Sequence, residues 1–287
     1  MTVRNDYKTS GAYRVRKVVR LSLTHFFLAL VSVTMVLPFI WMILSSFKTD
    51  GEMLAVPLKW LPTKWLWQNY VTTFEMAPWG LYFFNTLKIT VLSIVLQVFV
   101  ASTAAYALSR LEYKAKNVVF IIYLSTMMIP YQVTMIPTFS IIRDLGWIDS
   151  HLSLIIPGAF SVFAVFMLRQ FFLSIPSELE DAAMIDGCGY PRIYFEIIMK
   201  NSKPAIMTLI LFCFMGTWND FLRPMLYLNK TELWTMSLGL SKFKGNYVSM
   251  WSNMMCGAVV TTIPVIVVFL FAQKYFIEGI VMSGIKG

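Results

Sequence analysis

Long apolar stretches constrain this chain more than any other feature. Six of them can be read along the 287 residues, and each is long enough to cross a bilayer as a helix, which takes about 20 residues. Their expected bounds are 21–47, 84–109, 117–142, 152–172, 205–228 and 255–275. Because lipid offers no hydrogen bonds to an exposed backbone, such stretches must satisfy their own polar groups as helices. The sequence therefore predicts an all-α membrane protein with six transmembrane helices.

The composition excludes an ordinary soluble domain. Hydrophobic residues make up 57% of the chain and charged residues 14%, against about 25% charged residues in a typical soluble domain. A net charge of +9 would be compatible with nucleic-acid binding in a soluble protein. In a membrane protein, basic residues instead gather on the cytoplasmic side and set the orientation of the spans. We therefore expect no nucleic-acid partner.

The basic residues indicate which side is cytoplasmic. Six Lys and Arg residues precede the first span, and Asp6 is the single acid among them. From a cytoplasmic N-terminus, six spans return the C-terminus to the cytoplasm, and fifteen of the 24 Lys and Arg residues then lie on that side. The expected organisation is a cytoplasmic N-terminal segment (1–20), a six-span domain (21–275) and a cytoplasmic tail (276–287).

A charged segment interrupts the apolar chain between the fourth and fifth spans. The stretch "ELEDAAMIDGCGYPRIYFEIIMKNSKPA", residues 178–205, carries eight charged side chains. It belongs to a loop, residues 173–204, that this orientation puts in the cytoplasm. Ser177 and Glu180 fit an S-x-x-E capping box at the start of a helix. Gly187 can end that helix in the left-handed conformation, and Pro191 suits the first turn of another. We call the two predicted helices and their turn, residues 178–200, the elbow.

The elbow has the chemistry of a docking surface. Small side chains at Ala182 and Ala183 would let another surface approach, and four carboxylates would offer charge to a basic partner: Glu178, Glu180, Asp181 and Asp186. The alternative is an amphipathic loop that rests on lipid headgroups. Helices that bind anionic lipid are usually basic, whereas the first helix of the elbow is acidic. This pattern favours docking to a protein.

The motif "ELEDAAMIDG" followed by "SKPA" resembles the EAA motif of ABC importer permeases. Asp181-Ala182-Ala183 matches the Glu-Ala-Ala core of that motif, and Asp186-Gly187 matches its Asp-Gly. The sequence departs from the motif at Cys188, where Ala is usual, and at Lys200, where Pro is common. The resemblance implies that the loop couples the spans to a separate ATPase. The implied coupling residues are Glu180, Asp181, Ala182, Ala183, Asp186 and Gly187.

Three further segments, 127–158, 218–240 and 271–287, resemble the carbohydrate branch of these permeases. The resemblance implies an ABC type I importer permease fold in a bacterial-type cell (inner) membrane. It implies that the chain forms half of a pathway for a sugar, expected to be an oligosaccharide. The implied partners are a homologous second permease subunit in a heterodimer, two ATP-binding subunits and an extracytoplasmic solute-binding protein. The chain itself would bind no cofactor, since ATP and Mg would bind to the ATPase.

Polar residues in and between the spans are candidates for transport. Asn219 and Asp220 could line the substrate path, or they could hold the bundle together by interhelical hydrogen bonds. Trp218 could stack on a sugar in that path, or it could anchor the end of the span at the membrane interface. For Gln97 we predict a hydrogen bond within the bundle. The resemblance implies that an outer loop reaches the binding protein, although a passive loop is the alternative; its residues are Lys244, Gly245, Asn246 and Tyr247. It also implies that the tail, with Gly284 and Lys286, contacts the ATPase.

Other classes of function fit the sequence less well. Gly279 and Gly284 have the glycine spacing of a P-loop, but Ile285 stands where that motif needs Lys, so ATP hydrolysis requires a separate subunit and this chain is not an enzyme. The two His and three Cys residues lack metal-ligand spacing. An ion-coupled secondary transporter would need paired intramembrane acids or an inverted repeat, and only Asp220 is a candidate acid. An ABC importer for glycerol phosphate or a polyamine remains the alternative to a sugar importer.

Overall fold

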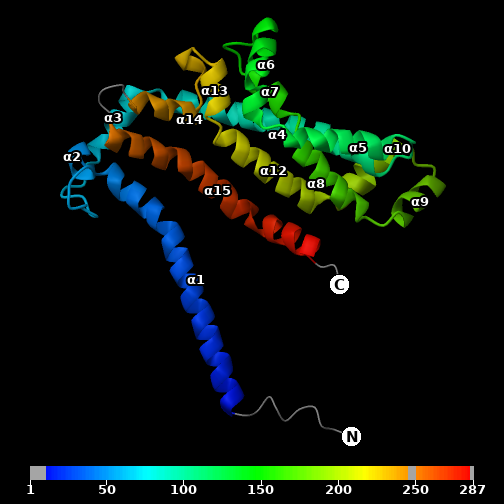
Figure 1. Cartoon of the computed structure of the whole chain (residues 1–287), viewed down its shortest axis with the longest axis horizontal. Helices are drawn as coiled ribbons and strands as arrows, with labels where there is room; N and C mark the ends of the chain where they lie inside the picture. The colour runs from blue at the N-terminus through cyan, green and yellow to red at the C-terminus, as the bar shows by residue number, and fades with distance from the viewer. Residues whose placement is uncertain (1–10, 245–249, 285–287) are drawn as a thin grey trace. The chain divides into compact units, whose positions relative to one another are not determined.

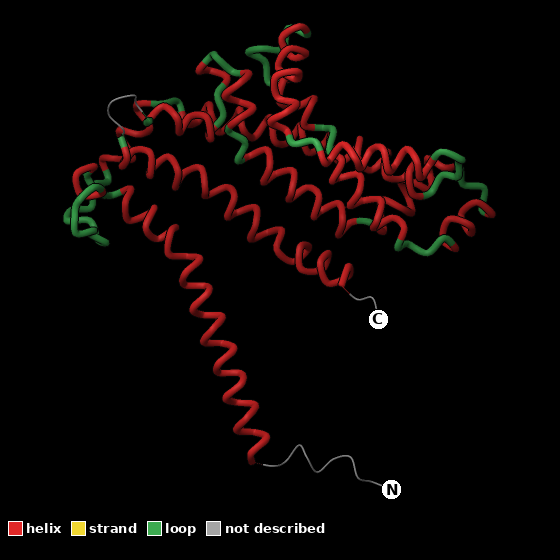
Figure 2. Tube along the Cα trace, viewed as in Figure 1, coloured by secondary structure: helices red, strands yellow, loops and turns green. Residues whose placement is uncertain are grey.

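The computed structural model describes residues 11–244 and 250–284, and the regular elements within these ranges are helices (Figure 2). The chain divides into two compact units, one formed by residues up to 73 with 245–259 and the other by 74–244 with residues from 260 onward. Four described helical segments, counting Leu152–Leu173 as one, are long and apolar enough to cross a membrane, or six if each of two bent helix pairs counts as one span. The prediction of an all-α membrane protein is confirmed.

The first unit contains α1 (Gly11–Ser46), α2 (Asp50–Met53), most of α3 (Gln68–Met76) and the start of α15 (Trp251–Gly284). The Asp50 carboxylate fixes the start of α15, accepting hydrogen bonds from Ser252 N at 2.7 Å and from Ser252 Oγ at 2.9 Å. The buried Lys48 donates to the carbonyl of Lys59 at 2.6 Å and lies 3.8 Å from the ring centroid of Trp41. The first and sixth predicted spans fall within α1 and α15.

The second unit is built around α4 (Trp79–Ser109), which packs along α8 (Val162–Leu173) and α12 (Lys203–Trp218) (Figure 1). Ala101, Ala105 and Ala164 in its core are completely buried, and such small side chains let helix backbones approach closely. Ser102 joins this core through a 2.7 Å hydrogen bond with the hydroxyl of Tyr194. Ala101, Ser102 and Ala105 therefore serve helix packing.

The third predicted span, 117–142, is not one helix. Helix α5 (Lys116–Ser125) continues into a short 3₁₀ helix, η2 (Thr126–Met128), and α6 (Tyr131–Asp144) follows at an angle of 99°. Pro130 explains the break, because its ring excludes the helical conformation for Ile129, which is extended at φ −87° and ψ 110°. The span is therefore broken at Pro130, a proline that the sequence leads us to expect to kink its helix.

The fourth and fifth predicted spans are also interrupted. The fourth consists of α7 (Leu152–Gly158) and α8, separated by residues 159–161. The fifth ends early, since α12 stops at Trp218 and a separate short helix, α13 (Leu222–Tyr227), follows. At 1.5 Å per residue, the 16 residues of α12 extend about 24 Å. The prediction of a helix from 205 to 228 is therefore wrong beyond Trp218.

The elbow lies at one end of the α4, α8 and α12 bundle (Figure 1). Its first helix is α9 (Glu178–Ile185), and its second runs through α10 (Tyr190–Ile193), a π-helical stretch η3 (Tyr194–Ile198) and α11 (Met199–Asn201). Gly187 has a φ of 80°. Next to it, Cys188 N donates to Ala183 O and Gly187 N donates to Met184 O, the two bonds of a Schellman helix end. The two predicted helices and the role of Gly187 are confirmed.

The predicted capping box at the start of α9 is absent. The Ser177 side chain makes no capping hydrogen bond, and its backbone is helical rather than extended, at φ −67° and ψ −25°. The Glu180 carboxylate reaches a residue far away in the sequence instead of the start of its own helix. A tertiary contact therefore overrides the local capping motif.

Short elements complete the second unit: η4 (Thr231–Leu233), α14 (Met236–Gly239) and η5 (Leu240–Phe243). Asn85 in α4 fixes this region by donating to the carbonyls of Glu232 at 2.8 Å and Trp234 at 3.0 Å. Phe243 is buried and stacks on Trp79 with a centroid distance of 6.1 Å. The segment after α13 is thus attached to the beginning of α4.

Candidate functional site

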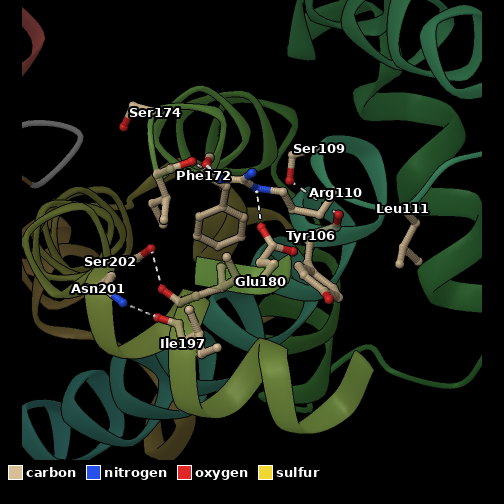
Figure 3. A network of polar contacts seen from close by, with 12 residues as sticks. Tyr106, Ser109, Arg110, Leu111, Phe172, Ser174, Glu180, Ile197, Asn201 and Ser202 are labelled. Atoms are coloured by element: carbon tan, nitrogen blue, oxygen red, sulfur yellow. Dashed lines mark hydrogen bonds and ion pairs between the residues drawn. The ribbon is translucent and has the colours of Figure 1, made fainter. Parts of the chain in front are cut away.

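Arg110, which follows the last residue of α4, connects three helices of the second unit (Figure 3). Its Nε lies 3.0 Å from Oε1 of Glu180 in α9. Its Nη2 donates to the carbonyl of Phe172 in α8 and, at 2.5 Å, to the carbonyl of Ile175 just beyond that helix. One guanidinium therefore joins the first helix of the elbow to the ends of α4 and α8.

The Arg110–Glu180 contact is a buried ion pair, because the two side chains are only 10% and 9% exposed. Nε and Oε1 are not aligned as a hydrogen bond. Burial raises the pKa of the Glu180 carboxyl, and the charge of Arg110 offsets this effect only in part. The desolvation of a buried pair often exceeds the attraction within it, so the value of this contact lies in fixing the position of α9.

Helix α9 has an inner and an outer face. Glu180 and Ala183 are each 7% exposed, and Ala183 belongs to the core that α4 and α8 share. Asp181, Ala182 and Asp186 are exposed. Glu180 was expected to offer its charge to a partner, but within this chain it is buried against Arg110. The exposed charges of α9 come from the other carboxylates.

The outer face of the elbow also exposes large apolar side chains. Ile185 at the end of α9 is 86% exposed, and Met184 and Leu179 are about half as exposed. Asp181 and Asp186 flank Met184 and Ile185 in the sequence. Exposed apolar groups that are rimmed by charge are typical of a protein-binding surface.

The structure separates the three substrate-path candidates. Trp218 is 1% exposed, donates from Nε1 to the carbonyl of Thr261 at 3.1 Å and packs on Phe214. Trp218 therefore packs inside the second unit, unlike the membrane-interface anchor that was its alternative prediction. Asn219 is exposed at the end of α12, and its side-chain Nδ2 donates to the carbonyl of Met215 at 2.9 Å. Asp220 forms a 2.5 Å ion pair with Arg223.

Two groups of predicted contact residues lie at the limits of the described chain. Lys244 is exposed and follows the buried Phe243, while Gly245, Asn246 and Tyr247 lie outside the described residues. Gly284 is the last residue of α15, and Lys286 lies outside the described residues. Their predicted contacts with a binding protein and with an ATPase stay predictions.

A pocket of about 300 Å³ lies between α4, the α7–α8 break and α12. Gln97 lines it and is 8% exposed. We predicted that Gln97 makes a hydrogen bond within the bundle, but its buried Oε1 has no hydrogen-bond partner in residues 11–244 and 250–284. That prediction is wrong for the carbonyl end of the side chain.

Residues 97–281 match the family described as the binding-protein-dependent transport system inner membrane component. The chain belongs to this family. It is therefore a multi-pass membrane permease of an ABC importer, and ATP hydrolysis belongs to a separate subunit.

Similar proteins and structures cover almost the whole permease. The arabinooligosaccharides transport system permease protein AraQ of Bacillus subtilis (strain 168) is 36% identical over 273 residues, which cover 94% of this chain and 97% of AraQ. The sn-glycerol-3-phosphate transport system permease protein UgpE of Yersinia enterocolitica is 31% identical over 82% of this chain and 86% of UgpE. A crystal structure of a bacterial ABC transporter that imports the acidic polysaccharide alginate contains a chain with a TM-score of 0.78 and 26% identity, covering 93% of this permease and 98% of that chain.

The sequence analysis did not single out two residues that make specific contacts in the structure, Arg110 and Arg223. Arg110 was counted only as a basic residue on the cytoplasmic side, where Lys and Arg at span ends are common. Arg223 lies inside the fifth predicted span, three residues after Asp220, which is the spacing of a helical ion pair. The spacing of Asp220 and Arg223 was therefore visible in the sequence, whereas nothing there indicated that Arg110 contacts Glu180.

The histidine and cysteine side chains show no metal site. The ring Nε2 of His151 lies 2.9 Å from the carbonyl of Leu233, which attaches the loop after α13 to the start of α7. Among the residues that the structure describes, no group of three or more His, Cys, Asp and Glu side chains could hold a metal ion.

Proposed function

We propose that this permease forms half of the pathway of an ATP-driven oligosaccharide importer and receives its motion from an ATPase docked on the elbow. The observation that carries this proposal is the two-sided construction of α9. Its outer face exposes Asp181, Asp186 and Ile185, while its inner face is held by the buried Arg110–Glu180 pair.

The construction of the elbow suits the transmission of force. A partner that moves α9 would also move Arg110, and through it the ends of α4 and α8. Packed helices respond to such a push by shifting as units, because a close-packed core does not deform continuously. Closure of the ATPase on ATP binding would therefore reach the helices that form the pathway.

The assembly we propose contains a homologous second permease subunit, two ATP-binding subunits that bind ATP and Mg, and an extracytoplasmic solute-binding protein. The elbow and both termini would face the cytoplasm. Gly284 and Lys286 would contact the ATPase, and the loop from Lys244 to Tyr247 would contact the binding protein. The family description, which names binding-protein-dependent transport, supports the last partner.

An oligosaccharide is the solute that the relatives favour. AraQ, which aligns over almost all of this chain, is named for arabinooligosaccharides, and the similar crystal structure is that of an alginate importer. UgpE is named for glycerol phosphate, and its similarity makes that solute the second candidate.

The test is ATP-driven uptake by the purified complex. The complex would be isolated through this chain from cells that express it with its native partners, and then placed in proteoliposomes with binding protein outside. We expect an ATPase to co-purify and labelled arabinotriose to accumulate only with ATP inside. Accumulation of glycerol 3-phosphate instead would favour the second candidate, and uptake that follows an ion gradient without ATP would contradict the proposal.

A further inference from the structure

The pocket beside Gln97 has the features of a ligand site that the fold leaves open. Its volume of about 300 Å³ is at the small end of the range for ligand sites, about 300–1,000 Å³. Its walls combine the amide of Gln97, the guanidinium of Arg223 and the rings of Phe160, Phe163 and Phe212. The pocket lies wholly within the second unit.

Four buried side-chain oxygens of α4 lack a hydrogen-bond partner among the described residues, and two of them, in Gln97 and Ser93, lie at or near the pocket. The Oε1 of Gln97 has no hydrogen-bond partner among the described residues, and neither has the Oγ of Ser93, which lies about one turn earlier and is 1% exposed. Buried polar atoms in native proteins are nearly always paired, so an unpaired one needs a partner, which can be an ordered water or a bound molecule. Gln97 faces the pocket, where such a partner would fit.

The break in the fourth predicted span is a second, independent observation. Helix α7 ends at Gly158, and Ser161 has an extended backbone, with φ −129° and ψ 113°, before α8 begins. Both residues line the pocket. Irregular backbone within a membrane-spanning segment is tolerated where it is buried in protein or lines a cavity, and transporters bind their substrates at such broken helices.

Arg223 supplies hydrogen-bond donors without adding net charge. Its Nε bonds to Oδ2 of Asp220 at 2.5 Å, and the carboxylate balances the guanidinium. Its Nη1 lies 3.7 Å from the position that a Cβ on Gly158 would occupy, and Ser93 Oγ lies 3.5 Å from the same point. The missing side chain at Gly158 lets both polar groups approach the helix break.

From this arrangement we infer that the pocket binds one ring of a neutral sugar during passage. Gln97 Oε1 accepts a hydrogen bond from one ring hydroxyl, and Arg223 Nη1 donates to another. Phe163 and Phe212, which pack edge to face at 5.6 Å, present apolar surface to the C–H groups of the ring. The inference rests on the proposed function and adds to it a contact point and an uncharged class of sugar.

A native thiol in the pocket reports whether it is occupied. Cys213 lines the pocket and is a free cysteine. In the assembled complex with Cys188→Ser and Cys256→Ser, the rate of Cys213 alkylation by N-ethylmaleimide would be measured with arabinotriose, with trigalacturonate, or with glycine betaine at equal osmolality. We expect arabinotriose to slow the alkylation several-fold and glycine betaine to leave it unchanged.

Gln97→Leu tests the proposed contact, because leucine fills similar space without the oxygen. The arabinotriose concentration that gives half-protection should rise about three- to tenfold, as the loss of one hydrogen bond predicts. Gln170→Leu, at an exposed position of α8, is the matched control and should leave that concentration unchanged. The protection measured on the complex with native Gln97 does not depend on how well either variant folds.

Three results would overturn the inference: no protection by arabinotriose, protection by trigalacturonate alone, or equal half-protection in the Gln97→Leu variant. The outcomes also separate this inference from the proposed function. If Gln97→Leu shows ATP-driven uptake with an unchanged KM, the sugar contact at Gln97 is contradicted, but the proposed importer function is not. If arabinotriose protects Cys213 in a complex that shows no ATP-driven uptake, the proposed importer function is contradicted, but sugar binding in the pocket is not.

Discussion

Arg110 and Glu180, seventy positions apart in the chain, meet in a buried ion pair with 3.0 Å between Nε and Oε1. The same guanidinium binds carbonyls at the end of α8, so the first helix of the elbow is fixed to two helices of the bundle at one point. The predictions below begin with this contact, because the transmission of motion from the elbow depends on it.

Arg110→Met should destabilise the protein more than Glu180→Gln. The first change leaves a buried carboxylate without its counter-charge, a loss that typically costs about 3–5 kcal/mol. The second leaves Arg110 with its two carbonyl partners. The double variant should recover part of the loss, and a double-mutant cycle on the free energy of unfolding measures the coupling.

The exposed pair Arg192–Glu196 is the control, and Arg192→Met should cost less than about 1 kcal/mol. Equal losses from Arg110→Met and Arg192→Met would contradict a structural role for the buried pair.

The stability of the protein should depend on pH through Glu180. Its pKa is raised in the folded state by burial, so protonation favours the folded form. The resulting contribution to the free energy of unfolding is fully present below the ordinary pKa of Glu, about 4.3, and is lost as the pH rises through the raised folded pKa. Thermal unfolding of the complex over a series of pH values should show this loss in the native protein and a flatter profile in Glu180→Gln. Identical profiles would show that Glu180 does not titrate differently in the folded state.

Gly187→Val should uncouple ATP hydrolysis from uptake. Gly187 has a φ of 80°, and a side chain held there is strained by about 1–3 kcal/mol even though no atom lies within 4 Å of an added Cβ. Gly189→Ala is the matched control, because Gly189 has a φ of −80° and an added Cβ meets only Pro191 Cδ at 3.9 Å. ATP turnover and uptake are measured on the same proteoliposomes. The idea fails if Gly187→Val transports as much solute per ATP as Gly189→Ala.

Asp181→Lys should weaken the binding of the ATPase. Asp181 is exposed on the outer face of α9, and a reversed charge against a basic partner should lower the affinity by about tenfold or more. Asp144→Lys makes the same exchange at another exposed carboxylate and should have no effect. The measurement is the amount of ATPase recovered with the permease at increasing salt. Equal recovery from the two variants would argue against docking through this face.

The elbow could be predicted from the sequence because its signals are local. Gly187 and Pro191 determine where its helices end and begin, and both act within a few residues of themselves. The Ser177–Glu180 capping motif is just as local, yet the structure replaces it with the contact between Glu180 and Arg110. That contact depends on where α4 and α9 lie in space, which periodicity and turn chemistry do not determine.

The pocket could not be predicted from the sequence either, because it also depends on how distant segments pack. Gln97, Gly158 and Arg223 come from three separate stretches of the chain, and only the packing of α4, α7 and α13 brings them to one cavity. The apolar runs were long enough to predict membrane helices, but run length alone cannot show that a helix breaks at Pro130 or ends at Trp218. The polar residues and the prolines inside the predicted spans, among them Pro130 and Pro157, were the available signals.

Cross-linking at Ile185 tests the central claim most directly, because this side chain is 86% exposed at the end of α9. Ile185→Cys would be introduced with Cys188, Cys213 and Cys256 changed to Ser, and the complex treated with a short thiol-to-amine cross-linker in inside-out and right-side-out vesicles. The account predicts a cross-link to an ATP-binding subunit, formed by membrane-impermeant reagent only in inside-out vesicles. Reaction from the outer side, or the absence of a cross-link to another polypeptide in a complex that hydrolyses ATP, would contradict it.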